Sequence, residues 1–420
     1  MQLIEKDKKT RTAVVCPVVK SENKFATLED IKNRVEEAKG LVLAMGQDAV
    51  LCFSAKLNKI VPRSLFGKGF IEKLKAECLE NDIALLVVDQ TITAVQQKNL
   101  EKELNLKVID RTAMILEIFG RRAQTKEGKL QVELAHLTYQ RGRLVRSWTH
   151  LERQRGGGGF LGGPGETQIE LDRRHIDSRI LKIKKELEKV KKTRAIQRGA
   201  RTKVPYPVVA LVGYTNAGKS TLFNKLTKAD VLAKDMLFAT LDPTMRKIEL
   251  KKGVDVILSD TVGFISNLPH ELVMSFRATL EEVLSADVVL HVIDASNPNY
   301  KTQRDDVIRV LHELGLSKIE NEDFYIEVLN KADLLDIEEK KHLLGMKREQ
   351  IVTVSALTGE GCDILLETLS NKFDDRNNIH EIVLDITDGK QLACIYNNSE
   401  VLQRIDDVNE GKIKLVIKSK

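Results

Sequence analysis

Cysteine and aromatic residues are scarce in this chain. Its 420 residues include only five cysteines and one tryptophan, and aromatic side chains make up 5%. The cysteines are scattered, odd in number and without a C-x-x-C pair: Cys16, Cys52, Cys78, Cys362 and Cys394. This pattern argues against a disulfide framework or a cysteine metal site, and it is typical of reduced thiols in the cytoplasm.

Long apolar runs are also absent. No stretch is long enough to span a bilayer, and charged residues such as Lys6, Lys8 and Arg11 interrupt any signal-peptide core. We therefore expect a cytoplasmic chain without stable membrane insertion. The length predicts about two to four domains.

One glycine-rich stretch carries the clearest chemistry. Gly213-Tyr214-Thr215-Asn216-Ala217-Gly218-Lys219-Ser220 fits G-x-x-x-x-G-K-S, the phosphate-binding loop. It follows an apolar run at 208–212 that predicts a buried strand, and a helical pattern begins behind it, as the motif requires. The glycines let backbone N–H groups turn toward phosphates, Lys219 supplies a point charge, and the Ser220 hydroxyl can ligate Mg²⁺.

Three later motifs, each after an apolar strand, indicate which nucleotide is bound. They are Asp260-Thr261-Val262-Gly263 (D-x-x-G), Asn330-Lys331-Ala332-Asp333 (N-K-x-D) and Ser355-Ala356-Leu357. The Asp260 carboxylate can reach Mg²⁺ through water, and the Gly263 N–H can sense a γ-phosphate. Asp333 can accept both N–H groups on the N1 and N2 edge of guanine, which adenine lacks. We therefore predict GTP and GDP as ligands, with Lys219 and Gly263 in catalytic roles.

A switch loop is expected between the first two motifs. Phe238-Ala239-Thr240-Leu241-Asp242-Pro243-Thr244 precedes a strand predicted at 247–250. A threonine here can ligate Mg²⁺ and close over the γ-phosphate. Thr240 and Thr244 are both candidates on chemistry alone.

A basic segment separates two α/β regions. Between Arg121 and Lys203 there are 22 Lys or Arg and 9 Asp or Glu, a local net charge of +13, whereas the whole chain carries +6. Two runs of leucine and isoleucine at heptad spacing flank a glycine-rich stretch at 156–165, which predicts an antiparallel helical hairpin roughly 40 Å long. RNA is the favoured partner, with Arg153, Arg155, Arg173 and Arg174 near the tip as candidate contacts. An anionic membrane or an acidic protein remains the alternative.

The whole chain is thus expected to be a multidomain α/β protein. We predict an N-terminal α/β domain (1–128), the basic hairpin (129–203), a GTPase domain with a mostly parallel sheet (204–375), and a small C-terminal α/β module (376–420). No motif indicates more than a monomer.

Phe264 stands where Ras-like enzymes place a water-orienting glutamine. A phenyl ring cannot orient or deprotonate water. We therefore expect a low intrinsic rate, with the missing group supplied by another residue, a cation or a partner.

Four further segments resemble the HflX family of GTPases. They are Thr125 to Ala135 (TKEGKLQVELA), Gly163 to Gln168 (GPGETQ) with Arg173-Arg174, Phe238 to Asp242 (FATLD), and Ser275 to Glu282 (SFRATLEE). The resemblance covers nearly the whole chain. It implies a cytoplasmic, ribosome-stimulated GTPase that binds the large ribosomal subunit and splits stalled or idle ribosomes.

The resemblance also implies roles for single residues. Thr240, rather than Thr244, matches the family's magnesium-ligating position. Asn216 matches a position at which some related GTPases hold K⁺ against the phosphates. Two other functions stay open: a subunit-assembly GTPase, and a regulatory switch that acts through a protein partner.

Overall fold

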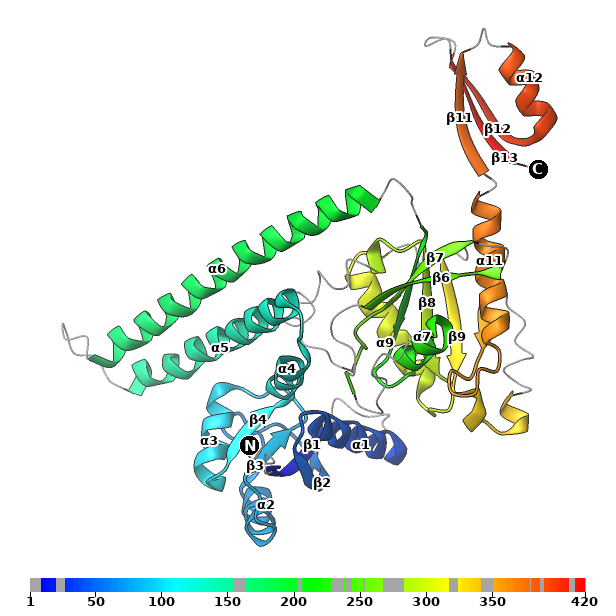
Figure 1. The fold of residues 1–420 in the computed structure, drawn as a ribbon. Helices are drawn as coiled ribbons and strands as arrows, with labels where there is room; N and C mark the ends of the chain where they lie inside the picture. The colour runs from blue at the N-terminus through cyan, green and yellow to red at the C-terminus, as the bar shows by residue number, and fades with distance from the viewer. Residues whose placement is uncertain are drawn as a thin grey trace, which may run out of the picture.

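The computed structural model describes residues 9–19, 27–154, 164–201, 206–228, 237–238, 244–251, 254–266, 283–316, 324–340, 350–377, 379–385, 389–407 and 412–419. Among these residues, no helix is long and apolar enough to cross a membrane. The chain forms a multidomain α/β fold, as predicted, with a phosphate-loop GTPase domain built on a mostly parallel sheet (Figure 1).

The N-terminal region is a four-stranded parallel sheet in the order β2-β1-β3-β4. Its strands are β1 (Arg11–Val19), β2 (Asp48–Leu57), β3 (Leu85–Val88) and β4 (Lys107–Asp110). Its helices are α1 (Leu28–Ala44), α2 (Lys68–Glu80), α3 (Ala94–Leu104) and α4 (Arg111–Arg122). Strands β1 and β3 are almost wholly buried because helices cover both faces of a parallel sheet.

Two long helices form the hairpin. Helix α5 (Lys126–Gln154) and helix α6 (Pro164–Arg201) run antiparallel beside each other in Figure 1. Ile180 and Ile183 are buried, and ion pairs join the helices from Arg141 to Asp177 and from Arg179 to Glu133. Helix α6 begins at Pro164, so the last two residues of the glycine-rich stretch are helical. Proline suits a first helical position because its missing N–H would have no partner there.

The GTPase domain has a six-stranded sheet in the order β10-β9-β8-β5-β7-β6, in which only β6 is antiparallel to its neighbour. The strands are β5 (Val208–Gly213), β6 (Thr244–Glu249), β7 (Asp255–Asp260), β8 (Val288–Asp294), β9 (Tyr325–Asn330) and β10 (Ile351–Thr353). The helices are α7 (Lys219–Thr227), α9 (Tyr300–Glu313), α11 (Cys362–Asn377) and the short 3₁₀ turn η3 (Ala332–Leu334). The chain leaves β5 toward β7 in one direction and β8 in the other, and such a switch point opens a crevice at the carboxyl ends of the strands.

The C-terminal module is a three-stranded antiparallel sheet with one helix. Its elements are β11 (Ile379–Asp385), α12 (Gly389–Asn398), β12 (Ser399–Asp407) and β13 (Lys412–Ser419). The core of the module contains Leu384, Ile413 and Leu415, against which residues of α12 pack. Figure 1 shows the module beyond the end of α11, away from the phosphate loop.

Candidate nucleotide-binding site

The phosphate loop follows β5 and leads directly into α7, and two of its positions require glycine. Gly213 and Gly218 have φ of 149° and 90°. A Cβ at Gly213 would lie 2.1 Å from the Val292 carbonyl oxygen, and one at Gly218 would lie 2.2 Å from Asn330 Nδ2. Any side chain at either position would therefore clash as well as strain the backbone.

Lys219 is buried at the start of α7. Its ammonium donates to the carbonyl oxygens of Gly213 (3.1 Å) and Tyr214 (2.7 Å). Burial lowers the pKa of Lys219 to about 8, and the nearby Asp260 carboxylate partly opposes this shift. The carbonyls hold the ammonium at the centre of the loop, where a phosphate needs its charge.

Hard oxygen donors meet beside this lysine. The Ser220 hydroxyl donates to Asp260 Oδ2 at 2.7 Å, which brings together residues from α7 and the end of β7. A hydroxyl next to a carboxylate suits Mg²⁺, which prefers such ligands together with phosphate oxygens and water. The residues therefore fit the magnesium ion on which GTPases of this type depend.

The remaining switch residues are only partly described. Ala239, Thr240, Leu241 and Asp242 lie outside the described residues, as do positions 267–282. Phe238 is described, and its ring meets the ring of Phe119 edge-on, with centroids 4.7 Å apart.

The D-x-x-G segment lies directly against the phosphate loop. The Phe264 N–H donates to the Gly213 carbonyl (3.0 Å), and the Thr215 N–H donates to the Phe264 carbonyl (2.6 Å). The Phe264 side chain is buried in the core cluster that also contains Val262. It therefore has a packing role in this conformation, and its ring brings no polar group to the phosphate loop.

Asn330 joins three of the motifs. Its Nδ2 donates to the Ala217 carbonyl (2.8 Å), and its Oδ1 accepts the Ala356 N–H (2.9 Å). Asn330 thus holds the phosphate loop and the Ser355-Ala356-Leu357 loop in fixed register, a role that its motif alone did not indicate.

Asp333 and Lys331 lie at the predicted guanine end. Asp333 Oδ1 accepts a hydrogen bond from the Ser355 hydroxyl at 2.6 Å, which orients the carboxylate. Lys331 has a left-handed backbone, with φ of 64°, and its ammonium pairs with Asp294 at 2.7 Å. Leu357, by contrast, has 74% of its surface exposed. The predicted nucleotide residues that are described thus converge on one edge of the sheet.

Two residues of the phosphate loop, Asn216 and Tyr214, have side chains in different surroundings. Asn216 is exposed, with φ of 61°. The Tyr214 hydroxyl instead donates to Glu37 of α1 in the N-terminal domain. No sequence motif indicated this contact, because it joins residues 177 positions apart.

The candidate RNA-contacting residues lie mainly on α6. Arg173 and Arg174 have 53% and 72% of their side chains exposed, with weak helical pairs to Asp177 and Glu170. Arg155 lies outside the described residues, and Arg153 is described only as backbone in α5. Further exposed lysines along α6 are Lys182, Lys184, Lys185, Lys189 and Lys192.

Four protein-family models match successive parts of the chain. Their descriptions are GTP-binding GTPase N-terminal (residues 32–120), GTP-binding GTPase middle region (122–201), 50S ribosome-binding GTPase (208–331) and HflX C-terminal domain (342–419).

Individual relatives match over most of their lengths. A GTPase HflX of Magnetococcus marinus is 52% identical over 358 residues, which is 85% of this chain and 80% of the relative. A GTPase HflX of Escherichia coli is 41% identical over 86% of this chain and 84% of its own. Among solved structures, a GDP complex of a GTP-binding protein from Sulfolobus solfataricus is 24% identical, covering 86% of this chain and 98% of its own, with a TM-score of 0.45.

Proposed function

Because the chain belongs to the HflX family of GTPases, we propose that its GTP-bound form binds the large ribosomal subunit and separates stalled or idle ribosomes into subunits. Hydrolysis of GTP then releases the protein. The matching family model for residues 208–331 is described as a 50S ribosome-binding GTPase, which supports this choice of partner.

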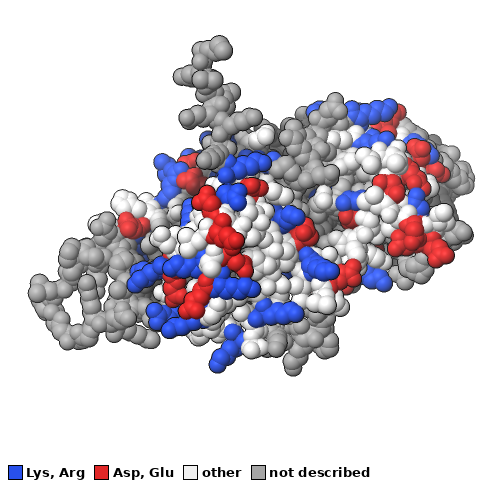
Figure 2. Space-filling view, turned by 90° about the horizontal axis from the view of Figure 1, so that it is seen from below, with Lys and Arg blue, Asp and Glu red and all other residues white. Residues whose placement is uncertain are grey.

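The observation that carries the proposal is the basic hairpin. Exposed cations follow α6 over several turns, as a phosphate backbone requires. The face seen in Figure 2 instead carries Lys and Arg interspersed with Asp and Glu among the described residues. A mixed surface of this kind gives little net attraction for a polyanion, so we assign RNA contact to the hairpin and its arginines, Arg153, Arg155, Arg173 and Arg174.

The N-terminal domain holds the base of this hairpin. Arg143 of α5 pairs with Asp110 at 3.0 Å, and the Tyr139 hydroxyl donates to Asp110 at 2.9 Å. Both contacts are largely buried, and burial raises the pKa of Tyr139, so its hydroxyl stays protonated. The hairpin and N-terminal domain would therefore move together when the tip engages RNA.

Within the GTPase site, we assign phosphate binding to residues 213–220, magnesium to Ser220 and Thr240, γ-phosphate sensing to Gly263, and guanine recognition to Asp333. Mg²⁺ supplies charge neutralisation at the phosphates when it is bound. Asn216 is the candidate contact for K⁺. Equal GTP turnover in potassium and sodium buffers would remove that assignment.

The test is GTP turnover with and without mature large subunits. We expect a stimulation of about tenfold or more, lost in Arg173→Ala/Arg174→Ala, with a flatter salt dependence of binding. A matched control is Lys75→Ala/Lys102→Ala, which removes two exposed cations of the N-terminal domain and should leave stimulation intact.

Sedimentation of mature ribosomes distinguishes the related functions. Conversion of whole ribosomes into subunits in the presence of a GTP analogue supports splitting. Binding to immature particles alone would indicate an assembly GTPase, and binding to neither would contradict the ribosomal proposal.

A further inference from the structure

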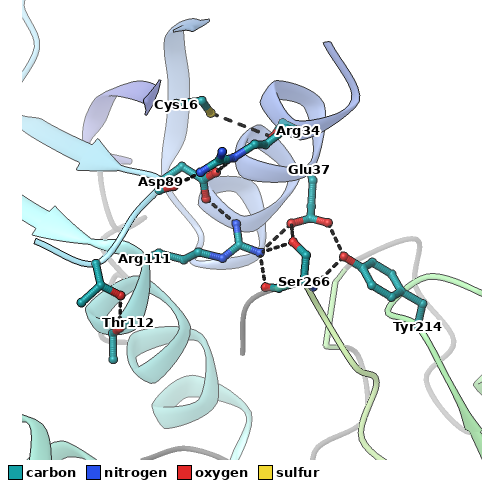
Figure 3. A network of polar contacts seen from close by, with 9 residues as sticks. Cys16, Arg34, Glu37, Asp89, Arg111, Thr112, Tyr214 and Ser266 are labelled. Atoms are coloured by element: carbon teal, nitrogen blue, oxygen red, sulfur yellow. Dashed lines mark hydrogen bonds and ion pairs between the residues drawn. The ribbon is translucent and has the colours of Figure 1, made fainter. Parts of the chain in front are cut away.

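The N-terminal domain contacts the GTPase domain at residues adjacent to both switches. The Phe119 ring of α4 packs on Phe238, which precedes Thr240. Glu37 of α1 meets Tyr214 of the phosphate loop and Ser266, which follows Gly263 by three residues (Figure 3). The contacts therefore involve residues next to Thr240 and Gly263, the two positions that are expected to respond to a γ-phosphate.

Four residues form a closed set of hydrogen bonds through their side chains and the Ser266 backbone, which we call the latch: Glu37, Arg111, Tyr214 and Ser266. The Tyr214 hydroxyl donates to Glu37 Oε2 (2.6 Å) and accepts the Ser266 N–H (2.6 Å). The Ser266 hydroxyl donates to Glu37 Oε1 (3.0 Å). Arg111 donates to Glu37 Oε1 (2.6 Å) and to the Ser266 carbonyl (2.9 Å).

The latch is largely shielded from water. Arg111 has 5% of its side chain exposed and Glu37 has 18%. Burial and the Glu37 carboxylate raise the pKa of Tyr214, so the phenol remains a hydrogen-bond donor. Arg111 is also paired with Asp89, which Arg34 contacts in turn, so its charge keeps a partner on the N-terminal side (Figure 3). Hydrogen bonds to charged groups in such surroundings are stronger than exposed ones.

The latched segment lies close against the phosphate loop at Gly263. A Cβ at Gly263 would lie 3.0 Å from Lys219 Nζ and 3.0 Å from Thr215 Cα. A γ-phosphate that binds the Lys219 ammonium and the Gly263 N–H must lie between them, about 2.8 Å from each donor. The Thr215 N–H is moreover occupied by the Phe264 carbonyl. Binding of the γ-phosphate thus requires residues 263–266 to move away from the loop.

We propose that the latch selects against GTP in the free protein, with Glu37 as the positioning residue that keeps Ser266, and through it Gly263, against the phosphate loop. GDP has no γ-phosphate and leaves the latch closed. GTP opens it and so loosens the contact between the N-terminal and GTPase domains. This inference rests on GTP binding by the GTPase domain, and it requires no ribosome.

The test variant is Glu37→Gln, because Arg111 keeps Asp89 as a partner when the Glu37 charge is removed. The matched control is Glu36→Gln, the neighbouring carboxylate, which has 69% of its side chain exposed and pairs only with Lys39 among the described residues. Titrations with fluorescent GDP and with a non-hydrolysable GTP analogue, both with Mg²⁺, give the affinity ratio. We expect Glu37→Gln to shift this ratio about tenfold toward the GTP analogue, and Glu36→Gln to leave it unchanged.

An equal change in both affinities would leave the ratio unchanged and would show that Glu37 only supports the fold. Unchanged affinities for both nucleotides would equally contradict the proposal. Should Glu37→Gln fold poorly, Ser266→Ala removes one hydroxyl from the latch and is expected to shift the ratio in the same direction.

Hydrogen exchange of the unmodified protein gives an independent test. The GTP analogue, and not GDP, should increase amide exchange in the middle of α1 around Glu37 and in the first turn of α4 at Arg111. Identical exchange in the two nucleotide states would contradict the opening of the latch.

Discussion

Replacement of Asn330 by alanine removes the carboxamide that joins the phosphate loop to the guanine end of the site. Asn330 is 1% exposed, and its two hydrogen bonds are 2.8 Å and 2.9 Å long. Each neutral hydrogen bond contributes about 1 kcal/mol net, and a buried group left without a partner costs about 1–3 kcal/mol. The variant leaves both the Ala217 carbonyl and the Ala356 N–H in that state, so we expect a total loss of about 3 kcal/mol.

This loss should fall mainly on nucleotide binding, because both orphaned groups belong to loops of the site. About 3 kcal/mol corresponds to roughly a hundredfold weaker affinity for GDP, measured by titration with a fluorescent analogue. Urea unfolding of the same variant measures how much of the loss appears instead as a lower free energy of unfolding. The control is Asn99→Ala, which removes an exposed hydrogen bond to the Arg63 carbonyl in the N-terminal domain. Affinity within threefold of the unmodified protein for Asn330→Ala would refute the reasoning.

Three further predictions follow from single positions. Asp333→Asn should prefer xanthosine over guanosine nucleotides, because the amide can donate to the carbonyl that xanthine has in place of the guanine amino group; competition binding measures this preference. Gly218→Ala should abolish nucleotide binding through the clash with Asn330 Nδ2. Gly69→Ala, in the first turn of α2, meets no atom within 4 Å and should raise the free energy of unfolding by roughly 0.5 kcal/mol in urea unfolding. Burial, and after it the nearby Arg304 charge, lowers the pKa of His291 to about 3. Between pH 6.5 and pH 3 the unfolded chain therefore binds a proton at His291 that the folded chain does not bind. The free energy of unfolding consequently falls as the pH falls. Relative to His291→Asn, the protein should lose about 2 kcal/mol between pH 7 and pH 5; equal losses in the two proteins would contradict this assignment.

The fold of the GTPase domain was predictable because its motifs mark the carboxyl ends of strands. Apolar runs located β5, β7, β9 and β10, and the motifs Asp260–Gly263 and Asn330–Asp333 followed them in the expected order. Heptad spacing likewise located α5 and α6. Local periodicity and short motifs are sufficient where the sequence of a helix or strand indicates by itself how that element is buried.

Other elements were not predicted from the sequence. Strand β2 was not predicted although its sequence holds an apolar run from Ala49 to Phe53, most of which is only half-buried in the structure. Strand β12 was not predicted either, and it has four consecutive exposed residues at 403–406. The latch was missed for a different reason. Glu37 and Ser266 lie 229 positions apart, and neither belongs to a motif with its own chemistry. Only the packing of α1 and α4 on the GTPase domain brings them together.

Two adjacent residues connect the hairpin with the latch. Asp110 caps the first turn of α4 through the Ala113 N–H (2.8 Å) and also holds Tyr139 and Arg143 of α5. The next residue, Arg111, holds Glu37 and the segment after Gly263. A displacement of α5 by a bound partner therefore acts on the same helical turn that positions the latch. Both sets of contacts include charged side chains that are at most 19% exposed. The pair Asp110 and Arg111 thus gives the nucleotide site a direct physical connection to the surface that we assign to RNA.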